Sequence, residues 1–302
     1  MKGIPRYFGF YLSDKPEILQ TEDEVDGYIN LIFNEDLSIQ SLHKFSSENK
    51  EPILWGLYKN TREIKTLLFE IEKVNKAIEI NRNDLFAVKE FRSILEHQKN
   101  ILNYFILDSI YANNKQILWS YKGEPQNISD FKSLNRLLSK ISYDIYCDTP
   151  TYKNELINKT KTSSAISVAR KNLIERIISN LNSPNLGFNE NEFPPEKTIY
   201  LTLLKQTGLH KKGEYGFSLG EPNDDSFRSL WQAGERYLEK TKVSKRKVSE
   251  LIEIFKEKPY KLKNGFIDFW LPTFILANQS HFAIYEQGRF LPELNSETIN
   301  LT

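Results

Sequence analysis

The sequence predicts an α+β protein that is mostly helical, and three observations lead to this prediction. Short runs rich in aromatic and β-branched residues lie within residues 1–58 and are typical of strands. After residue 60, apolar residues recur at steps of three and four, as one face of a helix requires. Near the C-terminus, two helical stretches precede a β-hairpin signal, which is the order of a winged-helix module.

Changes in this pattern divide the chain into four expected parts. They are a strand-rich segment over 1–59, a helical hairpin over 60–115, a helical middle domain over 116–240 and a winged-helix-like module over 241–302. A chain of 302 residues is long enough for two or three small hydrophobic cores.

In the first part, we expect strands over 7–12, 28–33 and 53–58. A helix between the first two strands is only weakly indicated, because acidic residues crowd positions 22–26.

The second part should be a helical hairpin. Asn60 and Glu63 resemble a capping box at its start, and apolar residues then follow helical spacing from Ile64 onwards. A polar break at 81–84 separates this helix from a second one over 86–110. The pattern fits a projecting, coiled-coil-like pair and two helices of an ordinary bundle equally well.

The third part should open with a short strand over 117–123. Helices are expected over about 130–147, 163–181 and 195–207, and Gly208 suits the left-handed residue that ends the last of them. A loop with a short strand at 215–219 and a helix over 227–240 complete this part.

The fourth part contains the expected winged-helix order. A helix should run from Val243 to Phe255, and a turn over 259–265 leads to an apolar helix over 266–277. Two short strands, 281–285 and 289–292, flank a turn of the hairpin type.

Composition narrows the functional classes. The net charge is +1, which argues against a protein that coats nucleic acid. Cys147 is the single cysteine, and its apolar surroundings without a nearby histidine favour a structural role over a nucleophilic one. We recognise no secretion leader and no apolar run approaching the ~18 residues of a membrane span. We therefore expect a cytoplasmic protein without membrane contact.

Motifs of common enzymes are missing from the sequence. We find no phosphate loop, dinucleotide fingerprint, His-Glu-x-x-His motif, paired cysteines or Gly-x-Ser-x-Gly elbow. The histidines are His43, His97, His210 and His281, and none has a histidine or cysteine two to four residues on. We expect no cofactor and no metal, and a binding role is favoured over an enzymatic one.

A polar segment in the middle of the chain is the most distinctive feature. It contains Asn154, Glu155 and Asn158, followed by Ser163 and Ser164. On a helix, the two asparagines would share a face and could meet a nucleotide, a phosphate or a partner backbone. Alternatively, these side chains bind backbone groups where the chain turns between helices. We favour this structural or domain-docking interpretation.

The C-terminal part offers a second candidate site. Its basic residues are Lys245, Arg246, Lys247, Lys261, Lys263 and Arg289. Winged-helix modules place such residues on DNA phosphates. The expected recognition helix, however, begins Phe266-Ile267-Asp268 and carries no Arg or Lys, so reading of base edges is not expected. Non-specific phosphate contact, protein docking or a merely solvated face are the alternatives.

Several of these segments together resemble a pattern in very large bacterial P-loop ATPases from phage-defence islands, including BREX-type systems. The matching residues are Asn154–Asn158, Ser163, Ser164, Arg170, Phe193–Glu196, Tyr200, Thr207–His210 and Ala283–Leu294. The resemblance covers roughly residues 140–295 and implies similarity to the region C-terminal to the ATPase domain. It implies a P-loop ATPase domain or subunit as partner, but no ATPase activity, because the nucleotide-binding motifs have no counterpart here.

Three functional hypotheses follow from the sequence. The first is a non-catalytic region of a defence-type ATPase, coupling a nucleotide-dependent partner to DNA or protein. The second is a stand-alone DNA-binding winged-helix protein. The third is a metal-independent hydrolase that uses carboxylates such as Glu155 and Glu196.

Overall fold

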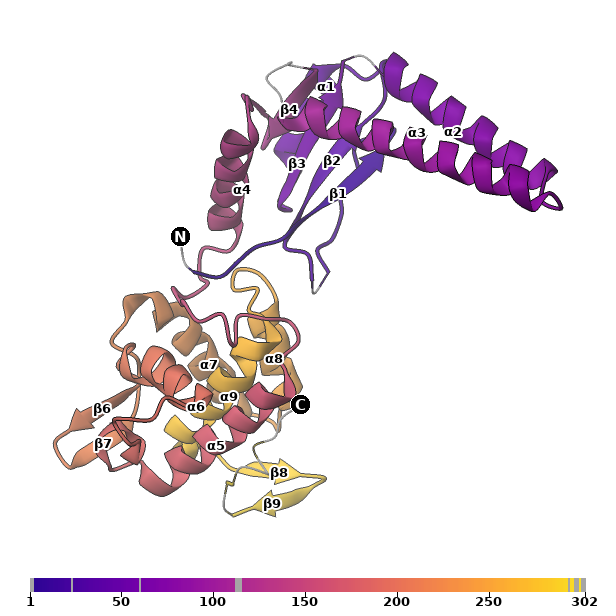
Figure 1. The fold of residues 1–302 in the computed structure, drawn as a ribbon. Helices are drawn as coiled ribbons and strands as arrows, with labels where there is room; N and C mark the ends of the chain where they lie inside the picture. Colours follow the sequence, from indigo (N-terminus) through magenta and orange to yellow (C-terminus); the bar gives the residue numbers. More distant parts are fainter. Residues whose placement is uncertain are drawn as a thin grey trace. The chain divides into compact units, whose positions relative to one another are not determined.

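A computed structural model describes residues 3–22, 24–59, 61–111, 116–292, 294–295 and 299 (Figure 1). Asn60 and Glu293, which belong to predicted motifs, lie outside the described residues. The fold is α+β and mostly helical, which confirms the predicted class. The chain forms two compact units. Unit 1 contains Met1–Arg6 and Tyr143–Thr302, and unit 2 contains Tyr7–Ser142. The changes of pattern at 59 and 241 fall inside these units.

Unit 2 is built on a sheet with the strand order β1-β2-β3-β4-β5. The strands β1 (Phe8–Ser13), β2 (Gly27–Ile32) and β3 (Ile53–Tyr58) run parallel, as neighbours in that order. Antiparallel strands β4 (Ile117–Tyr121) and β5 (Glu124–Gln126) complete the sheet. The three predicted N-terminal strands and the strand after the hairpin are confirmed, whereas β5 was not predicted.

The helix of the N-terminal segment lies between β2 and β3. The described residues between β1 and β2 form no helix, so the weakly indicated helix there is wrong. Instead, α1 (Ile39–Glu48) begins after Ser38, whose hydroxyl accepts a hydrogen bond from the Ser41 amide at 3.1 Å. Its Phe45 ring packs edge-on against Trp55 of β3, with centroids 5.9 Å apart. This crossover helix is what allows β2 and β3 to run parallel.

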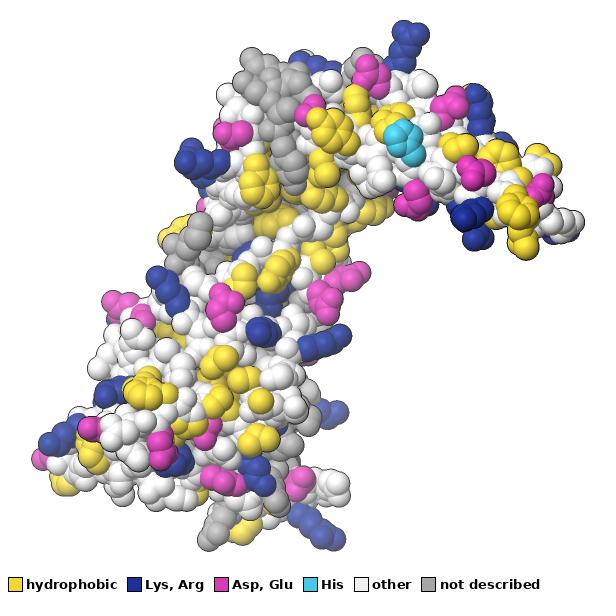
Figure 2. All heavy atoms as spheres, viewed as in Figure 1, with side chains coloured by type: hydrophobic (Ala, Val, Ile, Leu, Met, Phe, Trp, Pro, Cys, Tyr) yellow, Lys and Arg dark blue, Asp and Glu magenta, His cyan; other side chains and the backbone are white. Residues whose placement is uncertain are grey.

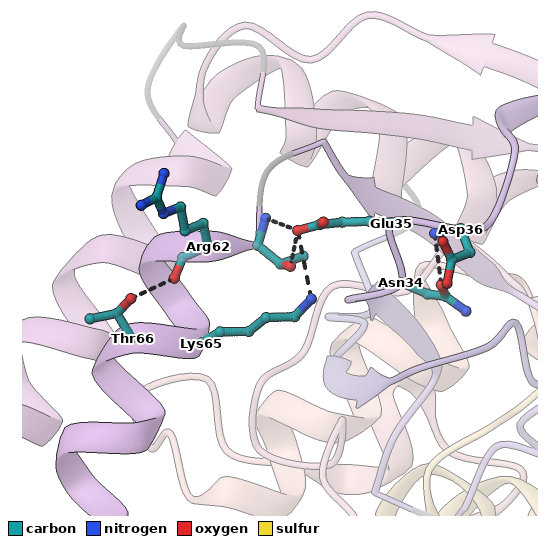
Figure 3. A network of polar contacts seen from close by, with 7 residues as sticks. Asn34, Glu35, Asp36, Arg62, Lys65 and Thr66 are labelled. Atoms are coloured by element: carbon teal, nitrogen blue, oxygen red, sulfur yellow. Dashed lines mark hydrogen bonds and ion pairs between the residues drawn. The ribbon is translucent and has the colours of Figure 1, made fainter.

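The predicted helical hairpin consists of α2 (Arg62–Ile80) and α3 (Leu85–Tyr111), and it projects from the sheet (Figure 1). Figure 3 shows how Glu35, which follows β2, holds its first turn. The Glu35 carboxylate accepts hydrogen bonds from the Thr61 hydroxyl and from the Thr61 amide, the latter at 3.0 Å. These bonds, with Lys65 at 3.7 Å, lower the pKa of Glu35. A negative charge at a helix N-terminus is favourable, so the carboxylate fixes the hairpin to the sheet.

Unit 1 surrounds one central helix. The helix α4 (Phe131–Ile145) runs into this unit, which contains α5 (Ser164–Asn180), α6 (Pro195–Ile199), α7 (Arg228–Thr241), α8 (Val248–Lys256) and α9 (Asn264–Ala277). All residues of α9 from Gly265 to Leu276 are buried except Asp268. Aromatic rings fill this core, and Phe274 of α9 lies edge-on to Trp231 of α7 with centroids 5.0 Å apart. The predicted helices of this part are confirmed, except that α8 begins at Val248 and not at the predicted Val243.

Two β-hairpins lie at the surface of unit 1. The first joins β6 (His210–Gly213) to β7 (Gly216–Leu219), and the second joins β8 (Ile284–Glu286) to β9 (Arg289–Leu291). A π-helical turn, Tyr200–Lys205, extends α6, and Gly208 after it has the predicted left-handed conformation with φ +74°.

The order α8, α9 and β8–β9 is the predicted one, but its architecture is not that of a DNA-reading winged helix. A recognition helix must expose side chains to the major groove. The helix α9 instead forms the core of unit 1, because its residues are buried on every side apart from Asp268.

Substitution of Gly234 tests this packing. A Cβ atom at Gly234 of α7 would lie 2.4 Å from the Phe274 ring. We expect Gly234→Ala to lower the free energy of unfolding, because overpacking costs about 1–3 kcal/mol and the helix propensity of Ala returns only about 1 kcal/mol. Urea unfolding measures the change. Gly220→Ala is the control, since its Cβ would meet only Lys211 at 3.8 Å. Equal stability of the two variants would contradict the packing of α7 on α9.

Candidate functional site

The polar segment around Asn154 forms a turn in unit 1, not a helix. The Asn158 amide donates to the Asn154 carbonyl at 3.1 Å. The Asn154 side chain accepts from the Leu156 amide at 2.9 Å and donates to the Thr202 hydroxyl at 2.9 Å. Both polar ends of this buried amide are therefore used within unit 1, and they tie the turn to the π-helical turn after α6.

Asn158 completes the same turn from inside. Its Nδ2 donates to the Tyr152 carbonyl at 3.2 Å, whereas its Oδ1 is buried without a hydrogen-bond partner among the described residues. The turn then passes the start of α9, where the Gly265 amide donates to the Lys159 carbonyl at 2.9 Å. A Cβ atom at Gly265 would lie 2.6 Å from the Ile157 carbonyl oxygen. Glycine is thus what lets the turn and α9 touch.

Other signature residues also make contacts inside unit 1. Arg170 of α5 lies 3.8 Å from the carboxylate of Asp268, the least buried side chain in the middle of α9. Burial raises the pKa of Asp268, and the positive charge of Arg170 opposes this rise. On α6, the buried Glu196 accepts a hydrogen bond from Asn172 of α5 at 3.1 Å. These two pairs join α5 to α9 and to α6.

The exposed members of the signature are Glu155, Ser163 and Ser164. Ser163 occupies the N-cap position of α5, but its side chain makes no capping hydrogen bond. Glu155 and Glu196 were the carboxylates of the hydrolase hypothesis. The former is exposed, and the latter is buried with its oxygen bonded to an amide.

A buried tyrosine–histidine pair lies next to this network, and the spacing of the sequence gave no sign of it. The Leu181 carbonyl can only accept, so the His210 Nε2 at 2.8 Å carries the proton. The Tyr200 hydroxyl then donates to His210 Nδ1 at 3.0 Å. Burial lowers the pKa of His210 and raises that of Tyr200 to about 12. Both groups are therefore neutral near pH 7, which suits packing better than acid–base work.

The predicted basic residues separate into two groups. Lys261 and Lys263 are buried, and Lys261 has a left-handed backbone with its carbonyl accepting from Arg6 at 2.7 Å. These two lysines are not presented to solvent. Lys245, Arg246, Lys247 and Arg289 are exposed.

Two exposed aromatic residues, which the sequence analysis did not single out, lie beside these basic residues. Tyr285 of β8 and Phe290 of β9 are paired across the hairpin, with centroids 5.8 Å apart, and are 47% and 55% exposed. The Lys245 ammonium lies 3.9 Å from the centre of the Tyr285 ring. We call Lys245, Tyr285, Arg289 and Phe290 the basic–aromatic surface. It joins the start of the α8 region to the β8–β9 hairpin.

Acidic residues limit the positive charge of this region. Arg246 forms an ion pair with Glu250 at 3.4 Å, and Glu286 faces Arg289 across the hairpin. Lys247 is held through its backbone, since its carbonyl accepts from the Tyr237 hydroxyl at 2.6 Å. Lys245 and Arg289 are the exposed cations that lie beside the aromatic pair of the hairpin.

Metal and membrane sites were sought over the same part of the chain. Within the described residues, no three His, Cys, Asp or Glu side chains come together as a metal site would need. Cys147 is exposed. None of the helices that the structure describes combines the length and the apolar character needed to span a bilayer.

Comparisons with known proteins add no further assignment. No protein-family model, curated protein or solved structure matches this chain.

The pH dependence of stability tests the buried pair. An unfolded chain protonates His210 near the ordinary pKa of 6.5, whereas the folded chain resists protonation. The free energy of unfolding should therefore fall as the pH drops below this value, until the folded histidine also protonates. In His210→Phe, this part of the fall should disappear, because His43, His97 and His281 are common to both proteins. If the free energies of unfolding of the wild type and His210→Phe change in parallel from pH 8 to pH 5, His210 is not buried in its neutral form.

Proposed function

We propose that this chain is a non-catalytic coupling module that joins a nucleotide-dependent partner to DNA. The partner would be a P-loop ATPase domain or subunit of a phage-defence system, as the resemblance of residues 140–295 implies. DNA would be held through its phosphate backbone, without base reading. The chain would supply no catalytic group and no cofactor.

The orientation of the signature residues supports a role without catalysis. Asn154 and Glu196 bond to Thr202 and Asn172, and Arg170 faces Asp268. Side chains that are committed to such contacts hold the fold and leave few polar atoms for a substrate. We therefore assign the signature to the internal architecture of unit 1, where it joins the turn and α5 to α6 and α9.

The basic–aromatic surface is the observation that carries the DNA contact. Lys245 and Arg289 offer exposed positive charge, and Tyr285 and Phe290 offer exposed rings beside it. Cations bind phosphate irrespective of sequence, and aromatic faces stack on any unpaired base. Because α9 is buried, the contact would come from the hairpin and the loop before α8. A stand-alone DNA reader lacks the exposed helix that it would need, and no contact favours the hydrolase hypothesis.

A salt titration tests this contact. We expect the chain to bind a short fluorescent DNA duplex with a log–log salt slope of about −0.9 per phosphate contact. Lys245→Ala and Arg289→Ala should each weaken binding and make the slope shallower by about one, equally for unrelated sequences. Lys171→Ala, at an exposed lysine of α5, is the matched control and should leave the titration unchanged. Binding that ignores salt, or no binding, would exclude the proposal.

The absence of catalysis is tested separately. We expect no ATP hydrolysis above background from the purified chain, because the phosphate loop has no counterpart in its sequence. Release of phosphate from ATP, measured with and without DNA, checks this. Turnover that is lost in Glu155→Gln or Glu196→Gln would instead identify a catalytic chain.

A further inference from the structure

The helical hairpin exposes apolar side chains that neither of its helices covers. On α3, apart from Leu85 at its first position, which is 80% exposed, these are Phe86, Ile94, Ile101, Tyr104 and Leu107, with exposed fractions of 86%, 44%, 38%, 73% and 46%. Figure 2 shows hydrophobic side chains spaced along the hairpin among charged ones. Single exposed apolar residues are ordinary, but five on one helix need a common explanation.

These five residues share one side of α3. At 100° per residue, they fall within an arc of roughly 140°, and His97 lies near the middle of it. The opposite side of the helix carries Leu95 and Leu102, which are more buried. We call the exposed side, from Phe86 to Leu107 with His97 at its centre, the outer stripe. The helix α3 thus has two apolar faces, of which α2 can cover only one.

The apolar residues of the outer stripe flank His97 at similar distances on both sides, except Tyr104, whose counterpart is the charged Glu90. Phe86 lies eleven residues before His97, and Leu107 lies ten after it. Ile94 lies three before, and Ile101 four after. Glu90 and Tyr104 lie seven residues on either side. At about 1.5 Å per residue, each pair of mates is symmetric about His97 to within about 1.5 Å along the helix.

We infer that two copies of this chain associate through their outer stripes, with the α3 helices antiparallel and His97 at the twofold axis. Phe86 of each copy then meets Leu107 of the other, and Ile94 meets Ile101. Tyr104 faces Glu90, whose carboxylate can accept the phenol proton in a hydrogen bond. A twofold interface requires a self-complementary surface, and the symmetry of the stripe provides one. This inference is independent of DNA binding.

Area and charge favour a second copy. A buried aromatic side chain covers roughly 150–250 Å². The largely exposed Phe86 and Tyr104, with the partly exposed Ile94, Ile101 and Leu107, therefore offer on the order of 500 Å² of contact. With their flanking residues, this approaches the ~800 Å² per partner of a stable interface. Residues 62–111 contain eight Lys or Arg and eight Asp or Glu, so two hairpins do not repel each other through net charge. An unrelated partner would not require the pattern to be symmetric.

Cysteine cross-linking in the full chain tests this geometry. Cys147 is first replaced by serine, and single cysteines are then introduced on α3. Under mild oxidation, His97→Cys should give a covalent dimer, because its two copies meet at the axis. Phe86→Cys alone should not, since its copies would lie about 33 Å apart, but it should cross-link when mixed with Leu107→Cys. Lys99→Cys, exposed but on another side of α3, is the matched control.

A measurement without cross-linking accompanies this test. Sedimentation equilibrium should show a concentration-dependent dimer of the unmodified chain. Ile101→Glu should weaken it on the order of 100-fold, because two apolar contacts are lost at about 1–1.5 kcal/mol each. Circular dichroism should stay unchanged, since Ile101 points away from α2. A monomer at all concentrations, an undiminished Ile101→Glu dimer, or cross-linking by Phe86→Cys alone or by Lys99→Cys would overturn the inference.

Discussion

Burial of α9 is the constraint on which the rest of unit 1 depends. A helix that is apolar on all sides must be surrounded, and its neighbours are shaped to approach it closely. Gly234 of α7 makes room for Phe274, and Gly265 makes room for the turn that carries Asn158. Asp268 is the one charged side chain in the buried stretch, and it forms an ion pair with Arg170. Removing a charge from water is costly, so the Asp268 carboxylate needs an opposite charge close to it, and Arg170 supplies that charge.

The burial of α9 also determines which polar side chains point into unit 1 and which remain at its surface. Asn154, Asn158 and Glu196 of the polar signature point inward and hold the turn and the helices around α9, in keeping with the structural interpretation favoured from the sequence. Two surfaces present exposed side chains that a partner could contact, one basic and aromatic and the other apolar. One is the basic–aromatic surface of unit 1, and the other is the outer stripe of unit 2. These two surfaces and the internal signature are the features on which the proposed coupling role rests.

Local signals were sufficient to predict most elements. Periodicity placed α2, α3 and α9 correctly, and β-branched and aromatic runs placed β1 to β4. The helix α1 was missed because its sequence, from Ile39 to Glu48, is rich in serine and has few apolar residues. Its stability comes from Leu42 and Phe45 packing on the sheet, which is a tertiary effect. Strand order depends on distant partners, so the pattern could not show it. The strands β5 and β6 pair with their hairpin neighbours β4 and β7, but three and four residues are too few for a clear alternation.

The candidate site was harder to predict than the fold. Lys261 and Lys263 have the same chemistry as Lys245, and only the folded chain shows that the first two are buried. The Asn154 segment was compatible with a helix and with a turn. The hydrogen bond from Asn154 to Thr202 and the one from the Gly265 amide to the Lys159 carbonyl belong to a turn. Tyr285 and Phe290 looked like strand residues of a core, because exposure is not encoded in a three-residue strand. The outer stripe, in contrast, follows helical spacing and could have been found from the sequence.

Hydrogen–deuterium exchange of the wild type and Asn158→Ala would test most directly that the signature serves the core around α9. The amides of α9 should be among the most slowly exchanging in the wild type. In Asn158→Ala, exchange should accelerate in residues 154–162 and at the start of α9, while α2 and α3 exchange as before. Unchanged exchange throughout unit 1 would contradict this account, because it would leave the signature free for a partner.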